Sequence, residues 1–332
     1  MSKRGSSSAL QFDMEGSFWA VVLAAGKGRR LSPLTGGTPK QFWRPTGAFS
    51  LLDETLARLA PLCPAERTVV VVDDGHRTYI GAQPGYREYG HVVFQPTDRG
   101  TAAGVLFGLV PVLTADPDGI VLLTPSDHGI GNAATFRRGI FEAVRCVRSS
   151  GGIVLLGVES AAASDDLGWM SLSSKGPAEG IRSVNGFVEK PPVALARRLL
   201  ASGAVWNTMV LVARTKDLVA LSGACLPEIT AMFLRAVAMP GSAHRAFFQD
   251  LYPRLPVSDF SSDVLAKARG LLAYTWPSSM GWSDLGTPER LRQWLGTTTP
   301  GVGAAGTASR LLACVPTPSL QEEVSQQSAG PG

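Results

Sequence analysis

Glycine and positive charge meet in one loop that directly follows the apolar run Phe18–Ala25. Gly26 and Gly28 let backbone N–H groups approach an anion closely, and Arg30 and Lys40 can neutralise its charge. The spacing matches neither the Rossmann GxGxxG nor the Walker A GxxxxGKS/T. The two glycines alone favour a tight turn with solvated cations, whereas the full string with both cations favours a phosphate-binding loop.

A carboxylate, Asp127, follows another apolar run, Ile120–Thr124, and is itself followed by His128. A lone aspartate in a turn is usually a cap. Where a carboxylate ends a strand close to bound phosphates, it can instead hold Mg²⁺, with substrate oxygens filling most of the metal shell. The surroundings of Asp127 therefore allow either a turn cap or a metal ligand.

A third polar loop, residues 95–103, separates an apolar run from a helical pattern and contains Gln95, Arg99 and Thr101. An ordinary strand-to-helix turn capped by Thr101 explains it as well as a ligand-binding loop does.

Strands and helices that alternate along the first half of the chain position these loops. Continuous apolar strands of this kind indicate an α/β, Rossmann-like fold with a mainly parallel sheet and helices on both faces. Ligands bind at the carboxyl ends of strands in such sheets, where the loops above lie. The predicted strands are Phe18–Ala25, Thr68–Val72, His91–Gln95, Ile120–Thr124 and Ile153–Val158, and the predicted helices are Leu51–Leu59 with Ser50 as N-cap, Ala102–Leu113 and Thr135–Val147.

From Trp169 onward, strand-like runs at Trp169–Leu172, Ile181–Glu189 and Val205–Val212 alternate with short helices. This change predicts a small C-terminal α+β part, at about residues 168–296, that binds substrate. We expect residues 17–296 to form the catalytic domain and residues 1–16 to form a disordered arm. Residues 297–332, rich in Gly, Ala, Ser, Thr and Pro, are expected to form a mobile low-complexity tail.

The composition indicates a globular protein with a large core, since 45% of the 332 residues are hydrophobic and 17% are charged. The formal charge of +4 suits phosphate-rich substrates but is too small to indicate nucleic acid. The cysteines (Cys63, Cys146, Cys225 and Cys314) are far apart, which favours free thiols. The chain has neither a secretory signal nor the ~20 apolar residues of a membrane span, so a cytoplasmic protein is expected.

Six motifs occur in the order found in the sugar-1-phosphate nucleotidyltransferases, which the chain resembles over about residues 18–296. The string LAAGKGRRLSPLT with the later PKQF resembles the glycine-rich signature of this family, and PKQF is similar to that of mannose-1-phosphate guanylyltransferases. The further motifs are QPTDRGTAA at 95–103, PSDH at 125–128, FVEKP at 187–191, WNTM at 206–209 and GWSDLGT at 281–287. A weaker match, Ser261-Ser262-Asp263, resembles SIDY, and we interpret Asp263 as structural, for instance as a helix cap.

The resemblance implies a role for each matching residue. The glycine-rich loop would wrap a nucleoside triphosphate, Arg30, Lys40 and Asp127 would be catalytic, and Asp127 and Asp284 would hold Mg²⁺. His128 is interpreted as structural, because the attacking sugar phosphate is already an anion. The nucleotide-binding residues would be Leu23, Ala24, Ala25, Gly26, Gly28, Arg30, Lys40, Gln95, Arg99 and Thr101, and the sugar-phosphate-binding residues Gly168, Glu189, Lys190 and Asn207.

The implied reaction transfers a nucleotidyl group from GTP to mannose 1-phosphate, giving GDP-mannose and pyrophosphate. The chain departs from the family pattern where Gly100 replaces Asn, Ala103 replaces Pro, and Met209 directly follows Thr208 without the usual Gly. These departures leave open another substrate pair, such as UTP or ATP with glucose 1-phosphate, and a non-catalytic regulatory relative that binds nucleotide sugar. No cupin extension follows, so isomerase activity is not expected. The sequence leaves the oligomeric state open, a homodimer included.

Overall fold

The computed structural model describes residues 17–45, 47–83, 86 and 89–298. The expected N-terminal arm, nearly all of the expected tail and Cys314 lie outside these residues. The strands are β1 (Phe18–Ala24), β2 (Thr68–Asp73), β3 (His91–Gln95), β4 (Ile120–Pro125), β5 (Gly129–Ile130), β6 (Ile153–Glu159), β7 (Gly168–Leu172), β8 (Ile181–Glu189), β9 (Val205–Arg214), β10 (Leu272–Trp276) and β11 (Trp282–Ser283).

The α-helices are α1 (Ser32–Thr35), α2 (Leu51–Leu59), α3 (Arg77–Gly81), α4 (Thr101–Ala115), α5 (Ala133–Ser150), α6 (Val193–Ala201), α7 (Thr215–Cys225), α8 (Pro227–Val237), α9 (Gly241–Leu251), α10 (Phe260–Asp263) and α11 (Pro288–Thr298). Short 3-10 helices lie at Arg29–Leu31, Lys40–Phe42, Ala65–Arg67, Asp74–His76, Tyr252–Arg254, Leu265–Lys267 and Ser278–Met280.

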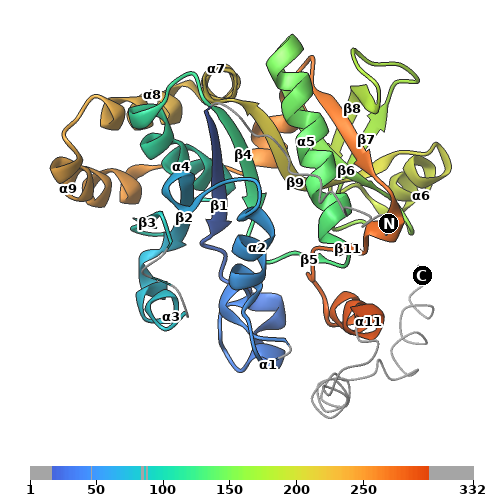
Figure 1. Ribbon diagram of the computed structural model, residues 1–332, viewed down its shortest axis with the longest axis horizontal. Coiled ribbons are helices and arrows are strands. Elements are labelled where there is room, and N and C mark those ends of the chain that lie inside the picture. Colours follow the sequence, from blue (N-terminus) through green and yellow to red (C-terminus); the bar gives the residue numbers. More distant parts are fainter. Residues whose placement is uncertain (1–16, 46, 84–85, 87–88, 299–332) are drawn as a thin grey trace, which may run out of the picture.

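Nine strands form one sheet in the order β3-β2-β1-β4-β9-β6-β10-β8-β7, and β5 pairs separately with β11 (Figure 1). β1 is parallel to β2 and β4, β2 to β3, and β6 to β10. Antiparallel pairing makes β8 and β9 run against the other strands of this sheet. The predicted α/β fold with a mainly parallel sheet is confirmed.

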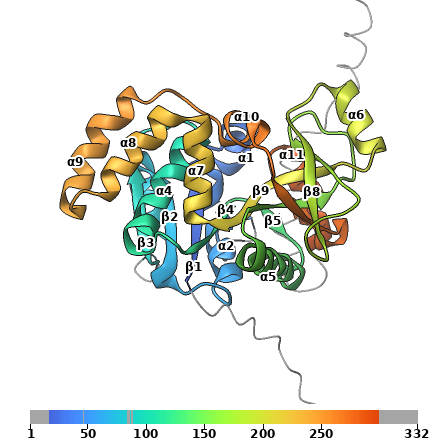
Figure 2. The same cartoon turned by 90° about the horizontal axis from the view of Figure 1, so that it is seen from above.

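Both faces of the sheet are buried. Successive strand residues point to opposite faces, and accordingly Val69 and Val71 of β2 enter the core that contains α4 and α8, while Val70 and Val72 enter the core that contains α2 and α5. This two-sided burial explains why the central strands are apolar at every position instead of alternating. In Figures 1 and 2, α8 and α9 lie at one end of the molecule and α6 and β8 at the other.

The sheet divides along β9, and this division positions the candidate site. The C-terminal half of β9 pairs with β4, from Leu211 to Arg214, and its first residues, Val205 and Trp206, pair with β7. The carboxyl end of β4 therefore faces the amino end of β7 across the intervening stretch of β9. In the described residues, this stretch, 207–210, has no ladder partner on that side.

Local signals predicted several elements well. Helix α2 has the predicted bounds, and Ser50 caps it: Oγ of Ser50 accepts the N–H of Asp53 at 3.1 Å, and Oδ2 of Asp53 accepts the N–H of Ser50 at 3.0 Å. The alternative interpretation in which Thr101 caps α4 does not hold, because Gly100 is the N-cap, with φ 83°, and Thr101 is the first helical residue. Among the described residues, no helix combines the length and apolar character needed to cross a membrane.

Candidate active site

The glycine-rich loop is fixed by the segment that carries Lys40. Gly28 has φ 58°, and a Cβ there would lie 3.0 Å from both Cβ and N of Lys40, so glycine permits this close approach. The buried side chain of Gln41 donates from Nε2 to the carbonyl oxygens of Ala24 at 2.7 Å and Gly26 at 3.0 Å. The PKQF string therefore holds the loop in place. This role of Gln41 was not predicted, although the string itself was recognised.

The segments that carry Asp127 and Asp284 lie side by side. β5 and β11 are antiparallel, with Gly129 opposite Ser283. Nζ of Lys40 lies 3.2 Å from Oδ2 of Asp127 and donates a hydrogen bond to the backbone carbonyl of Asp284. The structure thus brings both aspartates to the glycine-rich loop, with Lys40 in contact with each of them.

Burial and neighbouring charge set the protonation states in this group. Burial opposes ionisation of Asp127, but Lys40 and His128 outweigh it, and the pKa of the Asp127 carboxyl lies below its usual value. Burial lowers the pKa of His128 to about 4, against the attraction of Asp127. The indole Nε1–H of Trp282 donates to Nδ1 of His128 at 3.2 Å, which requires that nitrogen to be unprotonated. His128 is therefore neutral near pH 7 and is held in place by Trp282.

Asp284 is paired with Arg290, a residue that no sequence pattern singled out. Nη1 of Arg290 lies 2.9 and 3.0 Å from the two carboxylate oxygens of Asp284. Nη2 donates to Oγ of Ser164 at 2.9 Å and to the carboxylate of Asp166. Asp166 also lies 3.3 Å from Nη1 of Arg30. A row of alternating charges therefore connects Arg30 of the glycine-rich loop to Asp284.

The end of β3 and the loop after it combine a buried, unpaired acceptor with a tightly bound arginine. Gln95 is buried, and its Oε1 has no hydrogen-bond partner within the described part of the chain. Arg99 donates from Nε to the carbonyl of Tyr252 at 2.9 Å and from Nη2 to that of Pro253 at 2.7 Å. The guanidinium of Arg99 thus fastens this loop to the turn before α10.

Gly100 and Thr101 attach the same loop to α10. A Cβ at Gly100 would lie 2.3 Å from the carbonyl oxygen of Ser258, so a side chain at this position would collide with the backbone. Oγ1 of Thr101 donates to Oδ2 of Asp259 at 2.9 Å and accepts the N–H of Phe260 at 2.7 Å. The predicted nucleotide-binding residues Arg99 and Thr101 therefore hold the loop in place through protein contacts.

The four predicted sugar-phosphate residues lie together where β7, β8 and β9 meet. Gly168 is opposite Glu189, and a Cβ at Gly168 would lie 2.6 Å from Oε2 of Glu189 and 3.3 Å from Cβ of Asn207. Asn207 is buried, and its Oδ1 accepts the N–H of Met209 at 3.2 Å. Nζ of Lys190 lies 3.6 Å from Oε1 of Glu189, with 58% of the Lys190 side chain exposed. The Lys190 ammonium is thus accessible to a phosphate.

Asp259 connects the loop after β3 with the sugar-phosphate group. It accepts a hydrogen bond from Thr101, and its charge also acts on Glu189. Burial raises the pKa of the Glu189 carboxyl; Lys190 opposes this rise and Asp259 adds to it. Asp263, interpreted from the sequence as a cap, accepts the N–H of Asp259 at 2.8 Å at the start of α10. The short helix α10 is thereby fixed between the two groups.

Backbone strain is concentrated around these residues. Among the described residues, the non-glycine residues with positive φ are Lys190 at 47°, Met209 at 58° and Leu285 at 48°. Each such conformation costs roughly 1–2 kcal/mol. Lys190 is itself a predicted site residue, the N–H of Met209 donates a hydrogen bond to Oδ1 of Asn207, and Leu285 follows Asp284. Strained residues of this kind cluster at functional sites, and these three lie within or next to the predicted site residues.

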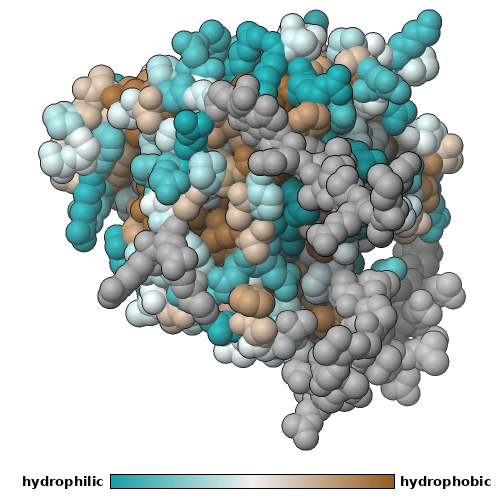
Figure 3. Space-filling model, in the orientation of Figure 1, coloured by the Kyte–Doolittle hydropathy of each residue, from teal (hydrophilic) through white to brown (hydrophobic). Residues whose placement is uncertain are grey.

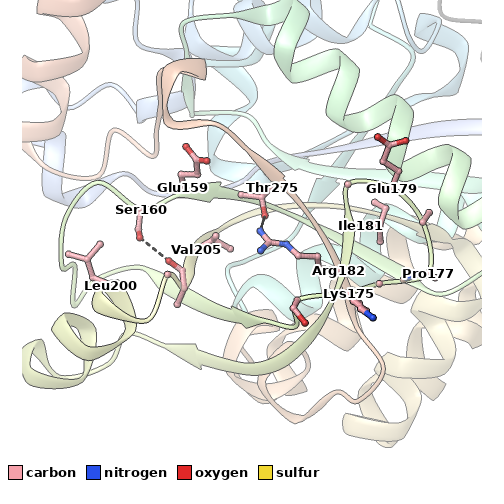
Figure 4. A pocket seen from close by; sticks show the side chains of 16 residues that line it. Glu159, Ser160, Lys175, Pro177, Glu179, Ile181, Arg182, Leu200, Val205 and Thr275 are labelled. Carbon is pink, nitrogen blue, oxygen red and sulfur yellow. Dashed lines mark hydrogen bonds between the residues drawn. The ribbon is translucent and has the colours of Figure 1, made fainter.

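A cavity of about 1000 Å³ lies elsewhere, between the β7–β8 connection and the turn before β9 (Figure 4). Its polar side chains are partly paired within the protein: Nη2 of Arg182 donates to Oγ1 of Thr275 at 3.1 Å, and Oγ of Ser160 donates to the carbonyl of Ala204 at 2.8 Å. None of the predicted site residues lines this cavity. Its volume alone therefore does not identify the place of the chemistry.

The two aspartates fit the limited requirements of Mg²⁺. Within the described residues, no group of three or more His, Cys, Asp or Glu side chains is arranged to hold a metal ion. Mg²⁺ is commonly bound by one or two carboxylates together with substrate phosphates, so a larger protein cage is not needed. Asp127 and Asp284 supply two carboxylates next to the glycine-rich loop, and the Lys40 ammonium contacts the carboxylate of Asp127 and the backbone carbonyl of Asp284.

Comparison with known proteins identifies the family. The model of the family described as Nucleotidyl transferase matches residues 19–298. The chain belongs to the nucleotidyl transferase family. This family member is 28% identical over 280 residues to the xanthan biosynthesis protein XanB of Xanthomonas campestris pv. campestris (strain B100), covering 80% of this chain and 57% of XanB. It is 27% identical over 275 residues to the mannose-1-phosphate guanylyltransferase of Salmonella muenchen, covering 80% and 57%. It thus spans a little more than half the length of these relatives.

Solved structures place this nucleotidyl transferase in the same fold. A crystal structure from Thermus thermophilus, named as a mannose-1-phosphate geranyltransferase, superposes with a TM-score of 0.75 at 27% identity, covering 84% of this chain and 79% of that one. A UDP-glucose pyrophosphorylase complexed with UDP-glucose superposes with a TM-score of 0.55 at 14% identity, covering 84% and 97%, and this likeness concerns the fold alone.

Proposed function

We propose that this chain transfers a nucleotidyl group from a nucleoside triphosphate to a hexose 1-phosphate, with GTP and mannose 1-phosphate as its substrates. The observation that carries the proposal is the meeting of two chemically different groups at the junction of β4 and β7. One joins Lys40 of the phosphate loop to Asp127 and Asp284. The other brings together Glu189 and Asn207, both of which lie against Gly168.

In the proposed reaction, a phosphate oxygen of the sugar phosphate attacks the α-phosphorus of the nucleotide. A new O–P bond forms, the bond from the α-phosphorus to the oxygen that bridges to the β-phosphorus breaks, and pyrophosphate leaves with the electron pair. The attacking oxygen is already an anion, so no general base is required. Neutral His128 accepts a hydrogen bond from Trp282 and is not needed as a base. The protein then contributes positioning and charge neutralisation.

The cations of the site divide between the two substrates. Lys40 and Arg30 would neutralise the triphosphate, whose oxygens the N–H groups of the glycine-rich loop can approach. The exposed ammonium of Lys190 would bind the phosphate of the sugar. Glu189 and Asn207 would exchange hydrogen bonds with sugar hydroxyls.

Asp127 and Asp284 are the residues that would hold Mg²⁺. When bound, the ion acts as a Lewis acid that withdraws charge from phosphate oxygens. The low pKa of Asp127 keeps its carboxyl ionised and ready to bind a cation at neutral pH.

GTP and mannose 1-phosphate are the preferred pair for two reasons. The PKQF and PSDH strings are similar to those of mannose-1-phosphate guanylyltransferases. Relatives of that name from Salmonella muenchen and Klebsiella pneumoniae are each 27% identical to this chain. The altered residues Gly100 and Met209 lie next to the two substrate groups, so the pair has to be tested directly.

The test is pyrophosphate release by the full chain, with GTP, ATP or UTP combined with mannose 1-phosphate or glucose 1-phosphate. We expect the highest kcat/KM for GTP with mannose 1-phosphate and no turnover when EDTA removes Mg²⁺. A higher value for another pair would replace the proposed substrates but keep the reaction. No release from any pair, together with binding of GDP-mannose, would contradict the proposal and favour a non-catalytic, nucleotide-sugar-binding protein.

A further inference from the structure

Helix α11 is anchored independently of the aspartate beside it. The N–H of Arg290 donates to Oγ1 of Thr287 at 3.3 Å, which caps the first turn. Apolar residues of α11 pack in a small core with Leu31, which follows the glycine-rich loop, and with Leu51 of α2. These residues are Leu291, Trp294 and Leu295. The position of Arg290 is therefore set by packing and capping that do not involve the carboxylate of Asp284.

Arg290 holds that carboxylate by both oxygens. Nη1 is within 3.0 Å of each of them, and the N–H of Gly286 adds a third hydrogen bond at 3.1 Å. A carboxylate offers about four acceptor sites, so about one is left for a further ligand. The side chains of Arg290 and Asp284 are only 23% and 15% exposed, so salt screens this pair less than a surface pair.

The same guanidinium is fixed on its other side. Nη2 bonds Ser164 and Asp166, which precede Gly168 of the sugar-phosphate group. The backbone next to Asp284 is strained, since Leu285 has φ 48°. Such a strained turn persists only where the surrounding structure fixes it, and Leu285 is buried in the same small core as the apolar residues of α11.

We propose that Arg290 is a positioning residue, which holds the Asp284 carboxylate in the single orientation that productive nucleotidyl transfer requires. The inference rests on the proposed function and adds to it a residue that lies on α11, outside the six motifs. Arg290 does not need to touch either substrate. Its effect on the reaction passes through Asp284.

Removing Arg290 is expected to change metal affinity and turnover in opposite directions, which makes this role testable. The positive charge of Arg290 weakens the attraction of Asp284 for a divalent cation, so removing that charge strengthens metal binding. Losing the orientation of Asp284 lowers turnover, because small misplacements of a working group are costly. A general loosening of the fold would instead weaken metal binding and turnover together.

The experiment compares the full chain with Arg290→Gln, Arg290→Lys and the matched control Arg292→Gln on the same helix, where Arg292 lies 4.0 Å from Glu289. Binding of Mn²⁺ alone is measured from the electron paramagnetic resonance signal of the free ion, and kcat is measured with Mg²⁺. For Arg290→Gln we expect Mn²⁺ to bind at least about threefold more tightly, and kcat to fall at least about 30-fold with the nucleotide KM within about threefold.

Arg290→Lys separates charge from geometry. It keeps the positive charge, so Mn²⁺ affinity should stay within about twofold of wild type. An ammonium cannot reproduce the planar set of donors to Asp284, Ser164 and Asp166, so kcat should still fall at least about tenfold. Arg292→Gln should leave both quantities unchanged.

Full activity of either Arg290 variant would overturn the proposal, and so would weaker Mn²⁺ binding by Arg290→Gln. If the Gln variant fails to fold, the Lys variant decides alone through its turnover. If the wild type releases no pyrophosphate with any substrate pair, the proposed function fails separately. The Mn²⁺ comparison then decides: tighter binding by Arg290→Gln supports the hold of Arg290 on Asp284, and unchanged binding overturns it.

Discussion

Charges at the candidate site are paired within the protein. Lys40 contacts Asp127, and Arg290 contacts Asp284. Each pair compensates the burial of its members, so removing one partner leaves the other uncompensated. Single substitutions at these positions should therefore have clear effects on turnover, even where they keep the size of the side chain.

Asp127→Asn and Asp284→Asn test the proposal that these two aspartates hold one Mg²⁺. Each change keeps the size of the side chain but removes the negative charge that would hold Mg²⁺. We expect both variants to fold normally and to lose at least ~100-fold in kcat, several kcal/mol being a typical Lewis-acid contribution. Because the two residues act as a unit, the double variant should be little worse than either single one. Near-wild-type turnover of either variant, at saturating substrates and Mg²⁺, would rule out this site.

Lys190→Ala tests the assignment of one cation to one substrate. The Lys190 ammonium is exposed beside Glu189, and a charge-assisted bond to phosphate is worth roughly 1.5–3 kcal/mol. We expect the KM for the sugar phosphate to rise by about one to two decades and the KM for the nucleotide to change little. Lys216→Ala, which removes a surface lysine paired with Asp118, is the control and should change neither. Equal effects on both substrates would remove the assignment.

His76 predicts a loss of stability in mild acid. Its Nδ1 lies 3.4 Å from Nε2 of Gln41, the residue that holds the phosphate loop. Burial lowers the pKa of His76; Asp73 opposes this and Lys27 adds to it. The unfolded chain, with a His pKa of about 6.5, then binds more protons than the folded one, and stability falls as the pH drops through that value.

The measurement is the Tm between pH 7 and pH 5. We expect His76→Phe to lose less than the wild type over this range, because it has no ring nitrogen to protonate. His91→Phe, at the exposed start of β3, should follow the wild type. The same decline in all three proteins would show that His76 does not contribute.

At the scale of elements, the contact between the loop after β3 and α10 depends on one glycine. Gly100→Ala places a Cβ 2.3 Å from the carbonyl oxygen of Ser258 and requires φ near 83°. Gly203→Ala is the matched control, because Gly203 has φ 74° with nothing within 4 Å of its Cβ position. We expect the free energy of unfolding in urea to fall by about 1–2 kcal/mol for Gly203→Ala. Gly100→Ala should lose about 1–3 kcal/mol more, and equal losses would contradict the collision.

Elements with a strong local signal could be predicted from the sequence. β3 and β8 have the predicted bounds, and α2 begins at the predicted Ser50 cap. The two-residue strands β5 and β11 were not predicted, since so short a segment carries no periodicity. β11 and β5 nevertheless bring Asp284 and Asp127 together. The pairing of β5 with β11, which matters most for the candidate site, therefore could not be predicted from the sequence pattern.

The candidate site shows the same limit at its side chains. Lys40, Asp127 and Glu189 stand in motifs that resemble those of a known family, so they were found. Arg290 contacts Asp166 across 124 positions of sequence, and α11 by itself is an ordinary amphipathic helix. Such residues come together only in the folded chain, so the local sequence spacing gives no sign of their contact.

At the scale of the whole molecule, the packed part of the chain extends through α11. Figure 3 shows polar and apolar side chains mixed over the face that Figure 1 presents. Leu291 and Trp294 are buried, so the helix belongs to the fold. We predict that a chain ending near Thr299 keeps the Tm and turnover of the full chain, because the remaining residues lack apolar periodicity. A chain ending at Gly286, which removes α11, should lose both. A large loss in the longer truncation would show that the tail packs on the domain.

The pairing of β9 has a consequence for how the protein is made. β9 lies between β4 and β6, yet Val205 comes 80 residues after Pro125, the last residue of β4. As the chain leaves the ribosome, β1 to β4 can assemble early, but one edge of β4 stays open until β9 has been synthesised. Open edges attract other chains, and contacts this distant in sequence form slowly. Aggregation during synthesis is therefore a hazard built into this topology. A chain that ends before β9 would keep this edge of β4 unpaired.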